Sequence, residues 1–123
     1  MKITIPYNPP SLNKIINANR YANAKLKKDW SNIMWFEIYR SINETGASKF
    51  KDKVHMKIII NFKTKGRRDW DNFIGGLKYL IDPLVENGVI KDDSRKIITK
   101  FDVEMNLGTG KPNETIIEIS EEK

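Results

Sequence analysis

Apolar and polar residues alternate along four segments of the chain, which is the pattern of half-buried β-strands. These segments are 2–7, 53–63, 96–107 and 114–120. Apolar residues also recur at every third or fourth position from about 24 to 45 and from about 73 to 87, which predicts two helices. Gly46 is placed to cap the first helix. The predicted element order is therefore β-α-β-α-β-β.

This order is typical of an α+β domain, in which a mixed or antiparallel sheet carries two helices on one face. No linker or repeat divides the 123 residues, so we expect a single domain over 1–123. Gly75 and Gly76 each cost roughly 1 kcal/mol inside a helix, so the second regular helix is expected to begin around Leu77. The segment 108–113 is expected to form a hairpin turn, and its GTGK run lacks the residues of a phosphate-binding P-loop.

The chain carries a net charge of +6, from 22 Lys and Arg against 16 Asp and Glu. Basic clusters of this kind suit a nucleic-acid partner. The candidate phosphate contacts are Lys63, Lys65, Arg67 and Arg68 in the centre of the chain, and Lys14 and Arg20 near its start. The chain has no cysteine, which excludes disulfides, thiolate zinc sites and thiol nucleophiles. It has no long apolar stretch either, so we expect no membrane segment and a cytoplasmic protein.

Four aspartates stand in two pairs within this basic sequence. Asp69 and Asp71 belong to the run RRDWDN, and Asp92 and Asp93 follow about twenty residues later in KDDS. Carboxylates are hard oxygen ligands that hold Mg²⁺ or Mn²⁺ and leave positions free for phosphate oxygens and water. Helix capping would explain Asp71 or Asn72, but it does not explain the other acids. The pattern predicts metal-assisted cleavage of nucleic acid.

A shared metal site places a condition on the sheet. Asp69 and Asp71 follow the central strand, whereas Asp93 precedes the next one, so the opposite ends of the two strands must meet. We therefore expect 53–63 and 96–107 to be antiparallel. A helix of roughly 24 Å followed by an extended return of roughly 20 Å is long enough for this connection. A calcium-binding EF-hand loop is excluded, because the positions counted from Asp69 lack the required glycine and carboxylate.

Several of these runs together resemble the RusA family of Holliday junction resolvases, which are small dimeric endonucleases found largely in phages and prophages. The runs are IPYNPPSLN at 5–13, RRDWDN at 67–72, GLKYLIDPL at 76–84 and GVIKDDS at 88–94. The resemblance implies that Asp69, Asp71 and Asp93 are catalytic, metal-binding aspartates and that Asp92 is an accessory acid beside the third. It also implies a homodimer that acts on DNA.

The same resemblance matches Lys78 to an essential lysine and Asn72 to the asparagine that follows the paired aspartates. If the helix is continuous from Asp71, Lys78 lies two turns further on and faces the same way, as a cation near the reaction centre should. The alternative for Lys78 is an exposed lysine that pairs with Asp82 four residues on.

The expected function is Mg²⁺-dependent resolution of four-way DNA junctions by paired symmetric nicks, in DNA recombination and repair, with Mn²⁺ as a substitute metal. Two alternatives stay open. A structure-tolerant nuclease on flaps, forks or other branched DNA would use the same ligands. A DNA-binding module without catalysis would need only the basic clusters, and its aspartates would be caps and turn residues.

Overall fold

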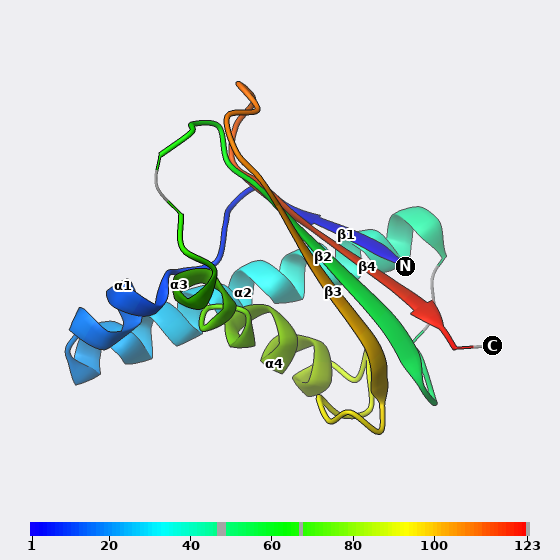
Figure 1. Cartoon of the computed structure of the whole chain (residues 1–123). Helices are drawn as coiled ribbons and strands as arrows, with labels where there is room; N and C mark the ends of the chain where they lie inside the picture. The colour runs from blue at the N-terminus through cyan, green and yellow to red at the C-terminus, as the bar shows by residue number, and fades with distance from the viewer. Residues whose placement is uncertain (47–48, 67, 123) are drawn as a thin grey trace.

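The computed structural model of the chain describes residues 1–46, 49–66 and 68–122. Its elements, in chain order, are β1 (Lys2–Ile5), α1 (Leu12–Asn17), α2 (Arg20–Thr45), β2 (Val54–Asn61), α3 (Trp70–Ile74), α4 (Lys78–Glu86), β3 (Ile98–Asn106) and β4 (Glu114–Glu121). The strands form one sheet and the helices lie on one of its faces (Figure 1). The α+β class is confirmed. In the described part of the chain, no helix is long and apolar enough to cross a membrane.

The strand order in the sheet is β1-β4-β2-β3. β4 is antiparallel to both β1 and β2, whereas β2 and β3 are parallel. The sheet is therefore mixed, and the expectation that 53–63 and 96–107 are antiparallel is wrong. Parallel neighbours need a crossover connection, and residues 62–97 with α3 and α4 supply it by bringing the chain back to the starting end of β2.

The expected hairpin at 108–113 is also wrong, because β2 lies between β3 and β4. The loop 107–113 instead passes over the end of β2 and binds the segment that continues this strand. The amides of Gly108, Thr109 and Gly110 donate to the carbonyls of Thr64, Phe62 and Lys63, respectively. The loop between the last two strands and the basic loop after β2 are thus held together by backbone hydrogen bonds.

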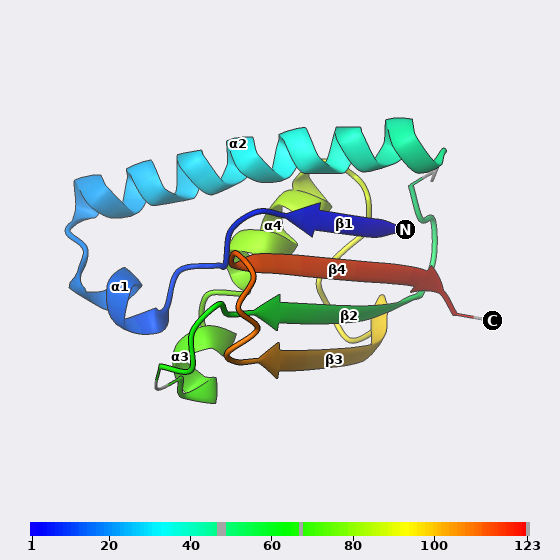
Figure 2. The ribbon, with the colours of Figure 1, turned by 90° about the horizontal axis from the view of Figure 1, so that it is seen from above.

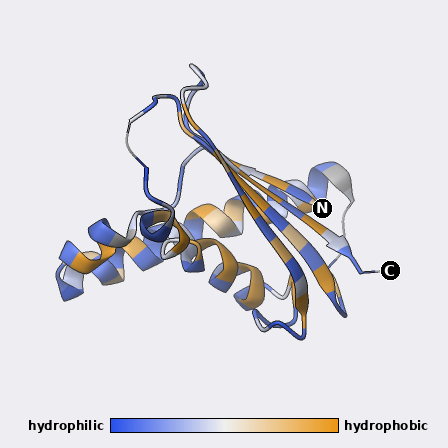
Figure 3. Ribbon diagram, viewed as in Figure 1, coloured by the Kyte–Doolittle hydropathy of each residue, from blue (hydrophilic) through white to orange (hydrophobic). Residues whose placement is uncertain are grey.

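The core lies between the sheet and the helices α2 and α4. α2 runs beside β1, the strand at one edge of the sheet (Figure 2), and buries Trp30, Met34 and Ile38 from the predicted stripe. Orange residues accordingly line the sheet and helices where they face each other (Figure 3). The two aromatic residues next to this stripe, Trp35 and Phe36, stay more than half exposed.

The second predicted helix is split in two, and a close backbone contact explains the break. Gly75 to Leu77 form a turn between α3 and α4, and Gly76 is buried against the carbonyl of Pro10. A Cβ atom at Gly76 would lie 1.9 Å from that carbonyl oxygen. Tertiary packing therefore requires a glycine at this position, because it lets the turn before α4 pack closely against the 5–13 segment.

One helix was not predicted. α1 begins after Ser11, whose hydroxyl accepts a hydrogen bond from the Lys14 amide at 3.3 Å, an N-cap that the hydrophobic pattern does not reveal.

Candidate metal and nucleic-acid site

Asp69 and Asp71 lie at the N-terminal end of α3, and both are exposed. Asp69 occupies the N-cap position in an extended conformation, and its backbone carbonyl accepts from the Asn72 amide. The Asp71 carboxylate accepts from the same amide at 3.0 Å. Asn72 uses its side-chain oxygen to accept from the Asn13 amide at 3.2 Å, which ties α3 to α1. The two carboxylates thus face solvent at one end of α3, and the hydrogen bond between Asn72 and Asn13 holds this end against α1.

The basic loop after β2 lies directly before these aspartates. The Arg68 guanidinium stacks 4.6 Å above the Phe62 ring, and Phe62 in turn meets Phe73 of α3 edge to face at 5.1 Å. Arg68 also donates to the Thr64 hydroxyl at 3.4 Å. These contacts hold a cation beside the start of α3, with its guanidinium over an aromatic ring. Arg67 lies outside the described residues.

Lys63 and Lys65 are exposed on the same loop. The Lys63 amide donates to the Asn113 side chain at 2.8 Å, and the Lys65 side chain lies over Gly108. The crossing of loop 107–113 also brings Lys111 into this region, since the Gly110 amide binds the Lys63 carbonyl. Lys111 was not among the predicted residues, because nothing in the local sequence shows that these two loops meet.

Lys78 is the first residue of α4 and is exposed. Because α3 ends at Ile74, no continuous helix runs from Asp71 to Lys78, and the argument that they share a helical face is wrong. The pair with Asp82, which was the alternative role for Lys78, is not among the salt bridges of the described residues. Both side chains instead line a cavity of about 370 Å³ between α2 and α4, together with Lys27 and Lys28.

The two remaining cations are also exposed. Lys14 lies on α1 and Arg20 begins α2. These helix segments extend beyond the end of the sheet on the same side as α3 (Figures 1 and 2). Of the two, Lys14 lies on a helix that contacts α3, whereas Arg20 starts the next helix.

Asp92 and Asp93 lie in the turn between α4 and β3 and are exposed. The Asp92 carboxylate accepts hydrogen bonds from the Asp93 amide and from Ser94, and these bonds hold the pKa of Asp92 below its usual value. Since β2 and β3 are parallel, this turn lies at the opposite end of the strand pair from the basic loop, and β2 alone spans on the order of 25 Å. Asp93 is therefore separated from Asp69 and Asp71 within one chain.

Among the described residues, no group of three or more acidic, histidine or cysteine side chains is placed to share a metal ion. The structure thus brings together Asp69, Asp71 and the basic loop. Asp92 and Asp93 stay apart from them, in the turn between α4 and β3. We expected Asp69, Asp71 and Asp93 of a single chain to share one metal ion. This expectation depended on antiparallel pairing of 53–63 with 96–107, and it is wrong because β2 and β3 are parallel.

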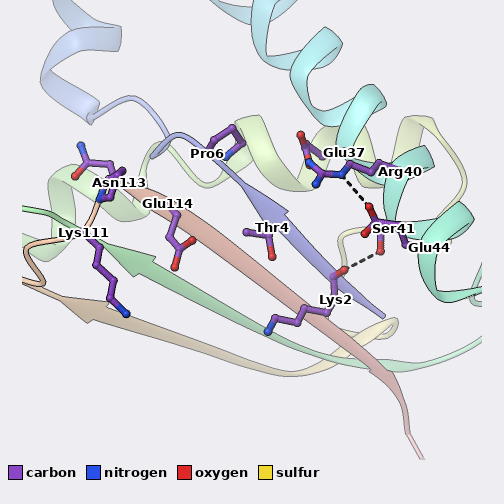
Figure 4. Close-up of a pocket in the computed structure, with 11 residues that line it drawn as sticks. Lys2, Thr4, Pro6, Glu37, Arg40, Ser41, Glu44, Lys111, Asn113 and Glu114 are labelled. Carbon is purple, nitrogen blue, oxygen red and sulfur yellow. Dashed lines mark hydrogen bonds and ion pairs between the residues drawn. The ribbon is translucent and has the colours of Figure 1, made fainter.

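A separate cavity of about 490 Å³ lies between α2, β1 and the 111–114 segment (Figure 4). Burial raises the pKa of Glu37 in its wall, and the nearby Arg40 guanidinium opposes this effect. The hydroxyl of Ser41 donates to the Lys2 carbonyl at 2.7 Å and closes the cavity floor. Of the predicted site residues that the structure describes, none lines this cavity.

In comparisons of the chain with known proteins, no family model and no curated protein matches it.

Proposed function

We propose that this protein is a Mg²⁺-dependent endodeoxyribonuclease that acts on branched DNA, as its resemblance to the RusA resolvases suggests. The observation that supports this most is the exposed carboxylate pair Asp69 and Asp71 directly beside a structured cationic loop. Carboxylates alone would repel a phosphate backbone, and cations alone would bind it without cutting. Their juxtaposition matches a site in which a metal ion meets a bound phosphodiester.

The donor set fits a hard divalent cation in part. Asp69 and Asp71 offer carboxylate oxygens that hydrogen bonds at the helix start do not fully occupy. Mg²⁺, or Mn²⁺ in its place, would supply Lewis-acid stabilisation and an activated water when bound. Arg68, Lys63 and Lys65 would hold the DNA backbone and position the scissile phosphate. The resemblance gives Lys78 an essential role as well, and its side chain lines the cavity between α2 and α4.

The third carboxylate requires a second subunit in this proposal. Asp93 lies at the other end of the β2 and β3 pair, so it reaches the Asp69 and Asp71 of its own chain only if the fold is disrupted. In a homodimer, the partner subunit's Asp93 would complete the site, and Asp92 would keep the turn that carries it in shape. Two such sites related by two-fold symmetry suit a four-way junction, which needs two opposed nicks.

The substrate assay uses a labelled four-way junction, a matched duplex and a flap DNA, each with and without Mg²⁺. We expect paired symmetric nicks confined to the junction and only in the presence of metal. Cuts on flaps as well would identify a structure-tolerant nuclease. Binding of the junction without any cut in Mg²⁺ or Mn²⁺ would show that the protein is a DNA-binding module, and the nuclease proposal would fall.

The cationic loop should carry part of the salt dependence of DNA binding. Each of Lys63→Ala and Lys65→Ala should reduce the slope of log affinity against log salt by about 1, because each removes one phosphate contact. Lys49→Ala is the matched control, since this exposed lysine lies in another region, near Gly88. Titrations of the junction at several salt concentrations measure the slope. Equal slopes for all three variants would exclude this loop from the DNA interface.

A further inference from the structure

β3 has an open edge. It pairs with β2 on one side, and within the described chain no strand pairs with its other side. Figure 2 shows β3 as the outermost strand, with no helix or strand alongside most of its free edge. The opposite edge strand β1 differs, because α2 runs beside it. An uncovered edge exposes a row of backbone donors and acceptors that can pair with another strand.

Apolar side chains gather next to this edge. Phe101 is 41% exposed and Leu107 is 42% exposed, and they continue the row that Val103 and Met105 form towards the helices. A strand edge flanked by uncovered aromatic and aliphatic residues is the composition of an interface core.

We propose that a second copy of this chain covers this surface, by antiparallel pairing of β3 with the partner subunit's β3 about a two-fold axis at Phe101. The charges along the strand support this partner and this register. With the axis at Phe101, Lys100 stands opposite the partner's Asp102 and Asp102 stands opposite the partner's Lys100. Opposite charges that face each other across strands stabilise the pairing, and like charges destabilise it.

The neighbouring registers are less favourable. An axis at residue 100 places two lysines opposite each other, and an axis at residue 102 places two aspartates opposite each other. An axis at residue 103 sets Asp102 against the partner's Glu104, and an axis at residue 104 sets two glutamates together. Of the registers centred on residues 100–104, the one at Phe101 alone has opposite charges facing and no like pair.

This inference deepens the proposed function, because it names the surface through which the subunits of the nuclease would pair. In an antiparallel pair, the start of the partner's β3 lies beside the end of β3, which is the end near α3 (Figure 2). The partner's turn 91–97, which precedes its β3, would therefore lie at this end. The partner subunit's Asp93 would then approach Asp69 and Asp71. Association itself requires no nuclease activity, so the two proposals can fail independently.

A single introduced cysteine tests the register, since the natural chain has none. Opposite residues in an antiparallel pair have Cα atoms about 4.5–5.5 Å apart, within the range that a disulfide bridges. We expect Phe101→Cys to form a disulfide-linked dimer under mild oxidation, seen on a non-reducing gel. Trp35→Cys is the control, because Trp35 is also an exposed aromatic residue but lies on α2, which runs beside the opposite edge strand β1.

A charge exchange tests the same register without a covalent bond. Lys100→Asp should weaken dimerisation by roughly tenfold in sedimentation, because it replaces two favourable pairs with two like-charge pairs. The double variant Lys100→Asp with Asp102→Lys should restore it. A monomeric wild-type protein, or a disulfide-linked dimer from Trp35→Cys and none from Phe101→Cys, would overturn the inference. A dimer that links through Phe101→Cys yet never cuts a junction would leave the inference standing and remove the proposed function.

Discussion

Asp71→Asn is expected to lower Mg²⁺-dependent junction cleavage by about 10³-fold or more, because a metal ligand contributes several kcal/mol to the stabilisation of the transition state. Asparagine keeps the size of the side chain and an oxygen that can accept the Asn72 amide, so α3 should fold as before. Single-turnover cleavage of a labelled junction measures the loss.

Junction binding by the same variant, measured in a chelator, should persist or strengthen slightly. The contacts expected to hold the DNA backbone come from Arg68 and the exposed lysines, and the substitution removes one negative charge beside them. Asp52→Asn is the matched control, since Asp52 is an exposed aspartate before β2 and belongs to neither of the two aspartate pairs. If cleavage by Asp71→Asn equals that of the control, the assignment of the metal site is wrong.

Gly76→Ala is expected to lower the free energy of unfolding by about 3 kcal/mol, as overpacking of a buried backbone contact does. The added Cβ would lie 1.9 Å from the Pro10 carbonyl oxygen, and neither backbone segment can rotate away as a flexible side chain would. Urea unfolding followed by circular dichroism measures the change. Because the contact positions the turn between α3 and α4, we also expect weaker cleavage from this variant.

Gly110→Ala separates this steric effect from the ordinary cost of replacing a glycine. Gly110 has a positive φ of 73° and open space where an added Cβ would lie, so alanine there should cost only about 1 kcal/mol of backbone strain. Equal losses for the two variants would mean that the segment with Pro10 moves aside, and that the contact does not hold the turn in place.

The secondary structure and the class of the fold follow largely from the sequence, for a local physical reason. Alternation places Ile58 and Ile60 of β2 on one face of a strand, and a spacing of four places Trp30, Met34 and Ile38 on one face of α2, where all five are buried. The closeness of Asp69 and Asp71 to the cationic loop is likewise a property of the chain order. Short-range periodicity and adjacency along the chain determine these features.

The tertiary structure alone decided which strands are neighbours and in which direction they run. The parallel pairing of β2 with β3 depends on how the whole connection 62–97 packs against the sheet, and the insertion of β2 between β3 and β4 removes the expected hairpin. The same packing sets Gly76 against Pro10 and moves Asp93 to the far end of the strand pair. Hydrophobic periodicity specifies the buried face of a strand but is the same for parallel and antiparallel neighbours, so this choice rests on contacts between residues far apart in the chain.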